Sequence, residues 1–106
     1  MSEQTLHVLI VDDEVNIRKT LTIQLESEGC KVVAVSNFDD AASEASQRFF
    51  ELAFVDVRLG AANGLDLIPV LLAAAPWLKI IVITAFASIE SAVEAIRRGA
   101  VDYLPK

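Results

Sequence analysis

Short apolar segments recur along the chain and alternate with segments in which apolar residues have a helical spacing. The apolar segments are VLIV (8–11), VVAV (32–35), LAFV (52–55), IIVI (80–83) and VDYL (101–104). The first four are continuously apolar and rich in branched side chains, which is typical of strands buried on both faces of a parallel sheet. Asp102 interrupts the fifth segment, so we expect an edge strand with Asp102 facing solvent.

The segments between these strands predict helices at residues 14–29, 39–50, 64–76 and 88–99. The first ends at Gly29, and the fourth begins at Ser88 and ends at Gly99, all preferred residues at helix ends. Pro69 is compatible with the third helix only if that helix has barely begun there.

The alternation of strands and helices predicts a single α/β domain. In this order they form a doubly wound five-stranded parallel sheet with right-handed crossovers, and 106 residues suffice for one core. The sequence stops at Lys106, directly after the fifth strand segment. A sheet covered on both faces would have a fifth helix here, so we expect a chain truncated before that helix and before any output domain.

Composition narrows the classes of function. A net charge of −6 with scattered Lys and Arg argues against direct nucleic-acid binding. The longest apolar stretches are too short to span a membrane. The N-terminal MSEQTL lacks the basic start and apolar core of a signal peptide. We therefore expect a cytoplasmic protein that does not contact a membrane.

Polar side chains gather at the carboxyl ends of the predicted strands, where open α/β sheets bind ligands. Asp12 and Asp13 follow the first strand, Asp56 the third, Thr84 the fourth and Lys106 the fifth. The second strand supplies no comparable charge, which fits the strand order 2-1-3-4-5. Carboxylates this close repel one another, so either some are protonated or a cation lies among them, and an all-oxygen cluster fits Mg²⁺. Together with the lysine and the hydroxyl, such a site suits a phosphoryl group.

Four motifs stand in order at these strand ends, namely VDDE, FVDVRLGAANGLDL, VITAFAS and GAVDYLPK. Together they resemble the receiver domain of bacterial two-component response regulators. The resemblance covers residues 7–106 and implies that residues 1–106 form one receiver domain with a flavodoxin-like (CheY-like) fold. GAVDYLPK and VITAFASIESAVEAI are most similar to receivers of enhancer-binding (NtrC-type) transcription activators. RLG and NGLD are similar to the alginate-regulator subgroup of those activators.

The resemblance gives the acids roles in phosphoryl and metal chemistry. It implies that Asp56 takes a phosphoryl group from a phosphohistidine of a sensor histidine kinase. It also implies that Asp13 and Asp56 bind Mg²⁺ directly and Asp12 mainly through water. The third protein ligand would be the backbone carbonyl of Arg58. Receivers commonly have Pro where this chain has Gly60, so we expect a more mobile loop with normal metal ligation.

The resemblance also implies roles for residues near the fourth and fifth strands. Thr84 and Lys106 match residues that contact the phosphoryl oxygens, and Tyr103 matches the aromatic switch residue that rotates when the threonine moves. Phe86, two residues after Thr84, is expected to shield the phosphoryl group from water. Trp77, in the loop before the fourth strand, is expected to be a packing residue.

The predicted function is a phosphorylation-controlled signalling switch and not a multiple-turnover enzyme. It would regulate an output domain in a longer chain, in transcription activation, and could form a homodimer. One alternative is a receiver-like interaction module that works without phosphorylation. The other is a Mg²⁺-dependent aspartyl-phosphate phosphatase. Such enzymes usually have an acid two residues after the nucleophile, where this chain has Arg58, which cannot donate a proton.

Overall fold

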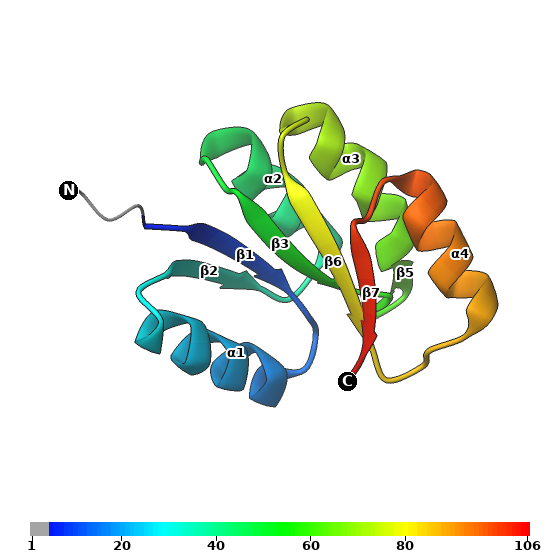
Figure 1. The fold of residues 1–106 in the computed structure, drawn as a ribbon, viewed down its shortest axis with the longest axis horizontal. Coiled ribbons are helices and arrows are strands. Elements are labelled where there is room, and N and C mark those ends of the chain that lie inside the picture. Colours follow the sequence, from blue (N-terminus) through cyan, green and yellow to red (C-terminus); the bar gives the residue numbers. More distant parts are fainter. Residues whose placement is uncertain (1–4) are drawn as a thin grey trace.

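The computed structural model describes residues 5–106 and contains a five-stranded parallel sheet (Figure 1). Its strands are β1 (His7–Val11), β2 (Lys31–Val35), β3 (Leu52–Asp56), β6 (Lys79–Thr84) and β7 (Asp102–Pro105). Their spatial order is β2-β1-β3-β6-β7, which confirms the predicted order 2-1-3-4-5. The order reverses between β1 and β3, so the carboxyl ends of these two strands flank the position where open α/β sheets bind ligands.

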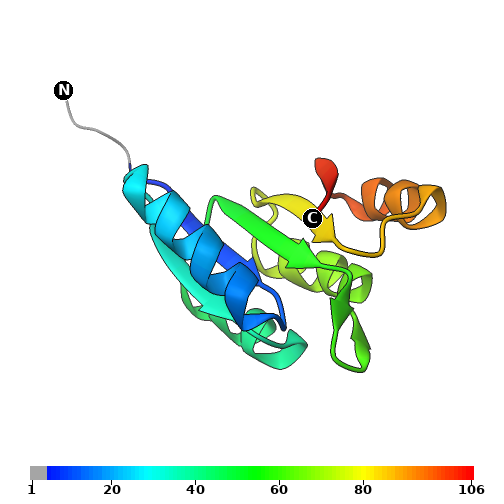
Figure 2. The ribbon, with the colours of Figure 1, turned by 90° about the horizontal axis from the view of Figure 1, so that it is seen from below.

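Helices cover the sheet unequally. They are α1 (Val15–Ser27), α2 (Phe38–Gln47), α3 (Leu67–Ala74) and α4 (Ile89–Arg98). Figures 1 and 2 show α1 on one face and the other three helices in a row on the opposite face. The main core lies under this row, where Leu9, Val55 and Val82 of the sheet pack with Leu67 and Leu71 of α3, all fully buried. Among residues 5–106 no helix is long and apolar enough to cross a bilayer.

The helix ends follow the predicted signals, with one difference. The Ser88 side chain accepts a hydrogen bond from the Ser91 amide at the start of α4, and Gly99 ends that helix with φ 116°. Pro69 lies in the first turn of α3, where its missing N–H costs nothing. The predicted extension of α2 to residue 50 is wrong. The helix ends at Gln47 because the backbone is extended at Arg48 (φ −128°, ψ 158°). In this extended segment Phe50 is buried in the core, while Phe49 is 54% exposed.

A short hairpin after β3 was not predicted. Strands β4 (Arg58–Leu59) and β5 (Ala62–Asn63) pair antiparallel and lead into a 3-10 turn, η1 (Gly64–Asp66). Gly60 lies in the connecting turn with φ 61°, a conformation that Gly adopts without steric cost. The glycine therefore has a definite role in a turn, and the predicted mobility of this loop remains a prediction.

The sheet face on the α1 side is only partly covered. Ile17 and Leu21 of α1, Phe54 of β3, Ile83 of β6 and Leu104 of β7 line an open hollow there. Leu104 is 42% exposed. At the edge strand β7, Asp102 is exposed as predicted.

Candidate functional site

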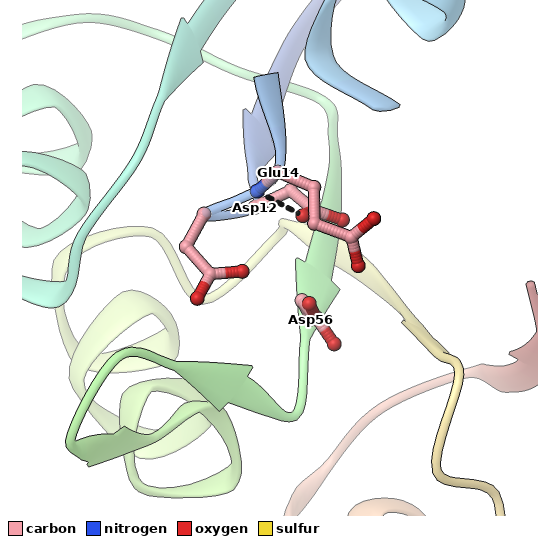
Figure 3. Close-up of side chains that lie close together, drawn as sticks. Asp12, Glu14 and Asp56 are labelled. Carbon is pink, nitrogen blue, oxygen red and sulfur yellow. Dashed lines mark hydrogen bonds between the residues drawn. The ribbon is translucent and has the colours of Figure 1, made fainter. Parts of the chain in front are cut away.

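A cluster of carboxylates lies at the carboxyl ends of β1 and β3. Asp12, Asp13 and Glu14 follow β1, and Asp56 is the last residue of β3. The two strands are paired, with Val11 opposite Val55, so Asp12 comes to lie beside Asp56. One carboxylate oxygen from each of the four acids lies within 4.8 Å of the others. Figure 3 shows Asp12 and Glu14 at the end of β1 close to Asp56.

Backbone contacts hold Asp12 in place. Its amide donates to the Val35 carbonyl at 3.1 Å, and its carbonyl accepts from the Arg18 guanidinium at 2.8 Å. Its carboxylate oxygen Oδ1 accepts from the Glu14 amide at 2.8 Å. Asp12 is fully buried and Asp56 is 3% exposed, so the structure keeps two carboxylates almost out of water at this edge.

The ammonium group of Lys106 lies among these acids. Its Nζ is 2.9 Å from Asp12 Oδ2, 2.9 Å from Glu14 Oε1 and 3.0 Å from Asp56 Oδ2. The contact with Asp12 is an ion pair by distance, whereas those with Glu14 and Asp56 are also aligned hydrogen bonds. The Lys106 amide donates to the Thr84 carbonyl at 2.9 Å. The last residue of the chain is thereby tied both to β6 and to the acids.

The environment shifts the pKa of two of these groups. Burial raises the pKa of the Asp56 carboxyl, and the nearby charge of Asp12 raises it further, while the hydrogen bond from Lys106 acts in the opposite direction. For Lys106, burial disfavours the charged ammonium. The contacts of its ammonium group with the carboxylates of Glu14, Asp12 and Asp56 outweigh that effect and raise its pKa. Lys106 is therefore a permanent positive charge at neutral pH.

One ammonium group does not balance the charge of this cluster. Unit charges 4 Å apart interact by about 4 kcal/mol at an effective dielectric constant near 20, so each unbalanced pair of carboxylates is costly. The four acids offer only oxygen donors, which are the ligands of hard divalent cations such as Mg²⁺. The residues present therefore fit a divalent metal.

The structure brings together most of the predicted site residues. Asp12, Asp13, Asp56 and Lys106 all lie in the cluster. The Arg58 amide donates to Asp56 Oδ1 at 3.3 Å, which places Arg58 next to the acids, while the role of its carbonyl stays a prediction.

Thr84 and Tyr103 have hydroxyl groups bonded elsewhere. Thr84 is fully buried, and its Oγ1 accepts a hydrogen bond from the Phe86 amide at 3.0 Å. The Tyr103 hydroxyl accepts from the Ser88 amide at 3.3 Å and shares a hydrogen bond with the Ser91 hydroxyl. Among residues 5–106, neither hydroxyl has a hydrogen bond to the carboxylates. Both are instead bonded to the loop and helix that follow β6.

Phe86 lies at the rim of the site. The guanidinium carbon of Arg58 is 3.8 Å from the centroid of the Phe86 ring, a distance at which a cation and a ring face attract each other. The ring itself is 56% exposed. This contact joins the hairpin after β3 to the loop after β6, across the mouth of the site.

Three features of the site were missed in the sequence. Glu14 is part of the VDDE motif, but the sequence pattern predicted no role for it, although its carboxylate contacts the ammonium group of Lys106. The amide of Gly60 donates to Asp13 Oδ2 at 3.1 Å. A Cβ atom on Gly64 would lie 1.8 Å from the backbone oxygen of Asp56, so only glycine fits there. The glycine in NGLD was a visible signal, but its close approach to Asp56 depends on the fold of the loop.

Comparisons with known proteins agree with this architecture. The profile of the family described as response regulator receiver domain matches residues 8–106. The alginate biosynthesis transcriptional regulatory protein AlgB of Pseudomonas aeruginosa is 40% identical over 105 residues, which are 99% of this chain and 23% of AlgB. The transcriptional regulatory protein ZraR of Salmonella typhimurium is 35% identical over 101 residues, or 95% of this chain and 23% of ZraR.

A solved structure shares the whole fold. It is a response regulator protein from Burkholderia pseudomallei with a phosphorylated aspartic acid, a calcium ion and citrate. The TM-score is 0.93 at 39% sequence identity, covering 95% of this chain and 59% of that one. The curated relatives are longer, and this chain spans about a quarter of their length. The family profile, the relatives and the fold agree with the motifs, and the chain belongs to the family of response regulator receiver domains.

Proposed function

We propose that this domain is a phosphorylation-controlled switch that accepts a phosphoryl group on Asp56. The observation that carries the proposal is the position of Lys106 Nζ, 3.0 Å from Asp56 Oδ2 and 2.9 Å from Asp12 Oδ2. A lysine far along the chain is thus held against the carboxylate that ends β3. A phosphoryl group bonded to Asp56 would replace one carboxylate oxygen contact of this lysine by a contact with a phosphoryl oxygen.

The chemical step would be a direct transfer from a sensor histidine kinase. A carboxylate oxygen of Asp56 attacks the phosphorus atom of the phosphohistidine, an O–P bond forms, and the P–N bond to the donor imidazole breaks. The electron pair of the broken bond stays on the donor nitrogen. Lys106 is positioned to balance negative charge on the transferred group, and the buried walls of the site limit access of water.

Asp12, Asp13 and Asp56, with the carbonyl of Arg58, would hold Mg²⁺. When bound, the metal would supply positive charge that offsets the charges of the carboxylates and the phosphoryl group. The Burkholderia relative, with its phosphorylated aspartic acid and calcium ion, supports both the modification and the divalent cation.

Phosphorylation would act on the loop and helix after β6. The modification adds close to two negative charges at Asp56. Asp56 pairs with Ile83 of the neighbouring strand β6, the residue before Thr84, and the family resemblance implies that the Thr84 hydroxyl contacts the phosphoryl group. If the hydroxyl of Thr84 leaves the Phe86 amide to bind the phosphoryl group, the loop must move, and the hydrogen bonds of Tyr103 to Ser88 and Ser91 move with it. Reversing a two-state equilibrium from 1:99 to 99:1 takes about 5.5 kcal/mol.

The output of the switch would lie in a longer protein. AlgB and ZraR are transcriptional regulatory proteins about four times as long as this chain, so we propose that the domain regulates an output domain in transcription activation. The open hollow beside α1 and β7 suits an additional helix of such a chain. We also propose that two receivers can pair, which sedimentation before and after phosphorylation would measure.

Incubation with acetyl phosphate and Mg²⁺ tests the proposal. The parent chain should gain one phosphoryl group by intact-mass measurement, and Asp56→Asn should gain none. Asp102→Asn is the matched control, because Asp102 is an exposed acid at the opposite end of a strand. Equal labelling of Asp56→Asn and the parent would refute the proposal. An unresponsive parent would favour the interaction module, and repeated turnover of an aryl phosphate would favour the phosphatase.

A further inference from the structure

An aromatic surface lies at the end of the sheet opposite the acids. Phe49 and Trp77 stack with ring centroids 5.5 Å apart and an interplanar angle of 20°. His7 meets the edge of Phe49 with centroids 6.4 Å apart. Phe49 is 54% and Trp77 53% exposed, and the nearby Leu6 is 43% exposed. Trp77 was predicted to be a packing residue, but the structure leaves half of it in solvent.

Hydrogen bonds anchor Trp77 and His7 of this surface, although half of Trp77 is exposed. The Trp77 indole Nε1 donates to the Phe50 carbonyl at 3.0 Å, and Phe50 itself is buried. The Glu51 amide donates to the His7 carbonyl at 2.9 Å, and the Glu51 carboxylate accepts from the His7 amide at 2.7 Å. The stack is therefore a preorganised apolar surface, a kind of surface that often marks a protein interaction site.

Open hollows flank the stack on both sides. One is lined by His7, Lys31 and Phe49 together with neighbouring residues of β2. The other is lined by Leu6, Trp77 and Lys79 together with the start of β3. A partner side chain can therefore contact the aromatic rings from either side.

Basic residues frame the same surface. Lys31 and Lys79 begin β2 and β6 and are exposed, and neither has an ion pair within residues 5–106. The order β2-β1-β3-β6 and the register place them three strand spacings apart, or about 14 Å. Exposed Arg48 lies beside Phe49, paired with Glu44. Of the acids at this edge, Glu51 is already bonded to His7 through its carboxylate, whereas Glu28, three residues before Lys31, and Asp102, at the start of β7, are exposed.

We propose that this amino-edge patch, made of Leu6, His7, Phe49 and Trp77 between Lys31 and Lys79, docks an acidic protein segment. In this segment an apolar side chain would rest on the Phe49–Trp77 stack, and acidic residues on both sides would meet the two lysines. The charge of the patch favours this occupant over a second copy of the chain, because symmetric pairing would bring the same lysines together. The domain carries a net charge of −6, so an acidic segment would be repelled by much of the remaining surface and directed to this edge.

A displayed library of random peptides, selected on the parent chain after depletion on Trp77→Ala, tests the proposal. The enriched peptides should have an apolar residue between acids. A labelled synthetic copy should bind the parent in an anisotropy titration and shift the emission of Trp77, the only tryptophan of the chain. Replacement of the peptide acids by Asn and Gln, or an increase in salt, should weaken binding.

Two matched pairs of variants separate docking from general effects. Trp77→Ala should weaken binding more than about tenfold, whereas Ile23→Ala, at a 69% exposed position on α1, should not. Lys79→Glu should weaken it by about fivefold or more, whereas Lys19→Glu, with the same charge change on α1, should leave it within about twofold. Circular dichroism would verify that each variant is folded.

The proposal fails if no Trp77-dependent peptide is enriched. It also fails if the enriched peptides lack acids, or if Lys19→Glu weakens binding as much as Lys79→Glu. Self-association of the chain that Trp77→Ala abolishes, without peptide binding, would assign the patch to a second copy instead. None of these readouts depends on phosphorylation, so the result is independent of the switch proposed above.

Discussion

Gly64→Ala tests whether the position of the Asp56 backbone controls its chemistry. A Cβ atom at this position would lie 1.8 Å from the Asp56 carbonyl oxygen and 2.8 Å from its carbonyl carbon. Both neighbours are backbone atoms of the proposed phosphoacceptor, so neither can rotate away as a side chain would. An ordinary van der Waals contact begins at 3.4 Å, so the end of β3 or the η1 turn must move by about 1.6 Å if it alone absorbs the clash.

A displacement of this size should reduce phosphorylation far more than it reduces stability. Misplacing a reacting group by about 1 Å can cost about a hundredfold in rate, whereas overpacking costs about 1–3 kcal/mol of folding free energy. We expect the initial rate of labelling by acetyl phosphate, measured by intact mass well below the melting temperature, to fall by about a hundredfold. The amide proton resonances of Asp56 and Val57 should shift at the same time.

Gly29→Ala is the matched control. Gly29 has φ 90°, so alanine is strained there, but no atom lies within 4 Å of the added Cβ. This variant should lose about 1–2 kcal/mol of stability and keep its rate of phosphorylation. A folded Gly64→Ala protein that is labelled within twofold of the parent would refute the reasoning, as would an equal loss of rate in Gly29→Ala.

Three further predictions concern the charges and the rim of the site. Lys106→Met leaves the buried carboxylates of Asp12 and Asp56 without their ammonium partner. We expect a loss of about 3 kcal/mol of stability in metal-free buffer and a smaller loss with Mg²⁺, as measured by thermal melts; equal melting temperatures without metal would contradict this. Asp13→Asn should weaken binding of Mg²⁺ by about tenfold or more in calorimetry, while Glu14→Gln, at a 54% exposed acid, should change it little; the reverse order would show that Glu14 is the ligand. Phe86→Ala should speed loss of the phosphoryl group, because it removes both the ring and its contact with Arg58, and Trp77→Ala, an equally exposed aromatic far from the site, should leave the decay rate unchanged.

Much of the fold was readable because its signals are local. Continuous apolar runs with branched side chains predicted four strands of the sheet, and the interrupted segment VDYL predicted the fifth as an edge strand; Ser88 and Gly99 marked both ends of α4. The uncharged end of the second strand fitted the predicted order 2-1-3-4-5, since parallel strands deliver their carboxyl ends to one edge. The same argument predicted from the sequence that Asp12, Asp13, Asp56 and Lys106 lie together, as the structure shows.

Other features depend on residues distant in sequence and could not be read from a local pattern. No periodicity predicts that Glu14 reaches Lys106, that the Gly60 amide binds Asp13, or that Gly64 approaches Asp56 too closely for a side chain. These contacts arise where two loops meet, so their geometry is set by the packing of the elements that the loops connect.

The chain thus specifies its strands, its helices and the charged residues of its site through local pattern, because burial and capping act over a few neighbouring residues. Tertiary structure decides which acids share the ammonium of Lys106, where the hydroxyls of Thr84 and Tyr103 are bonded, and that Phe49 and Trp77 stack in solvent. Each of these contacts joins residues of separate elements, so it forms only when the packing of the helices on the sheet brings those elements close together.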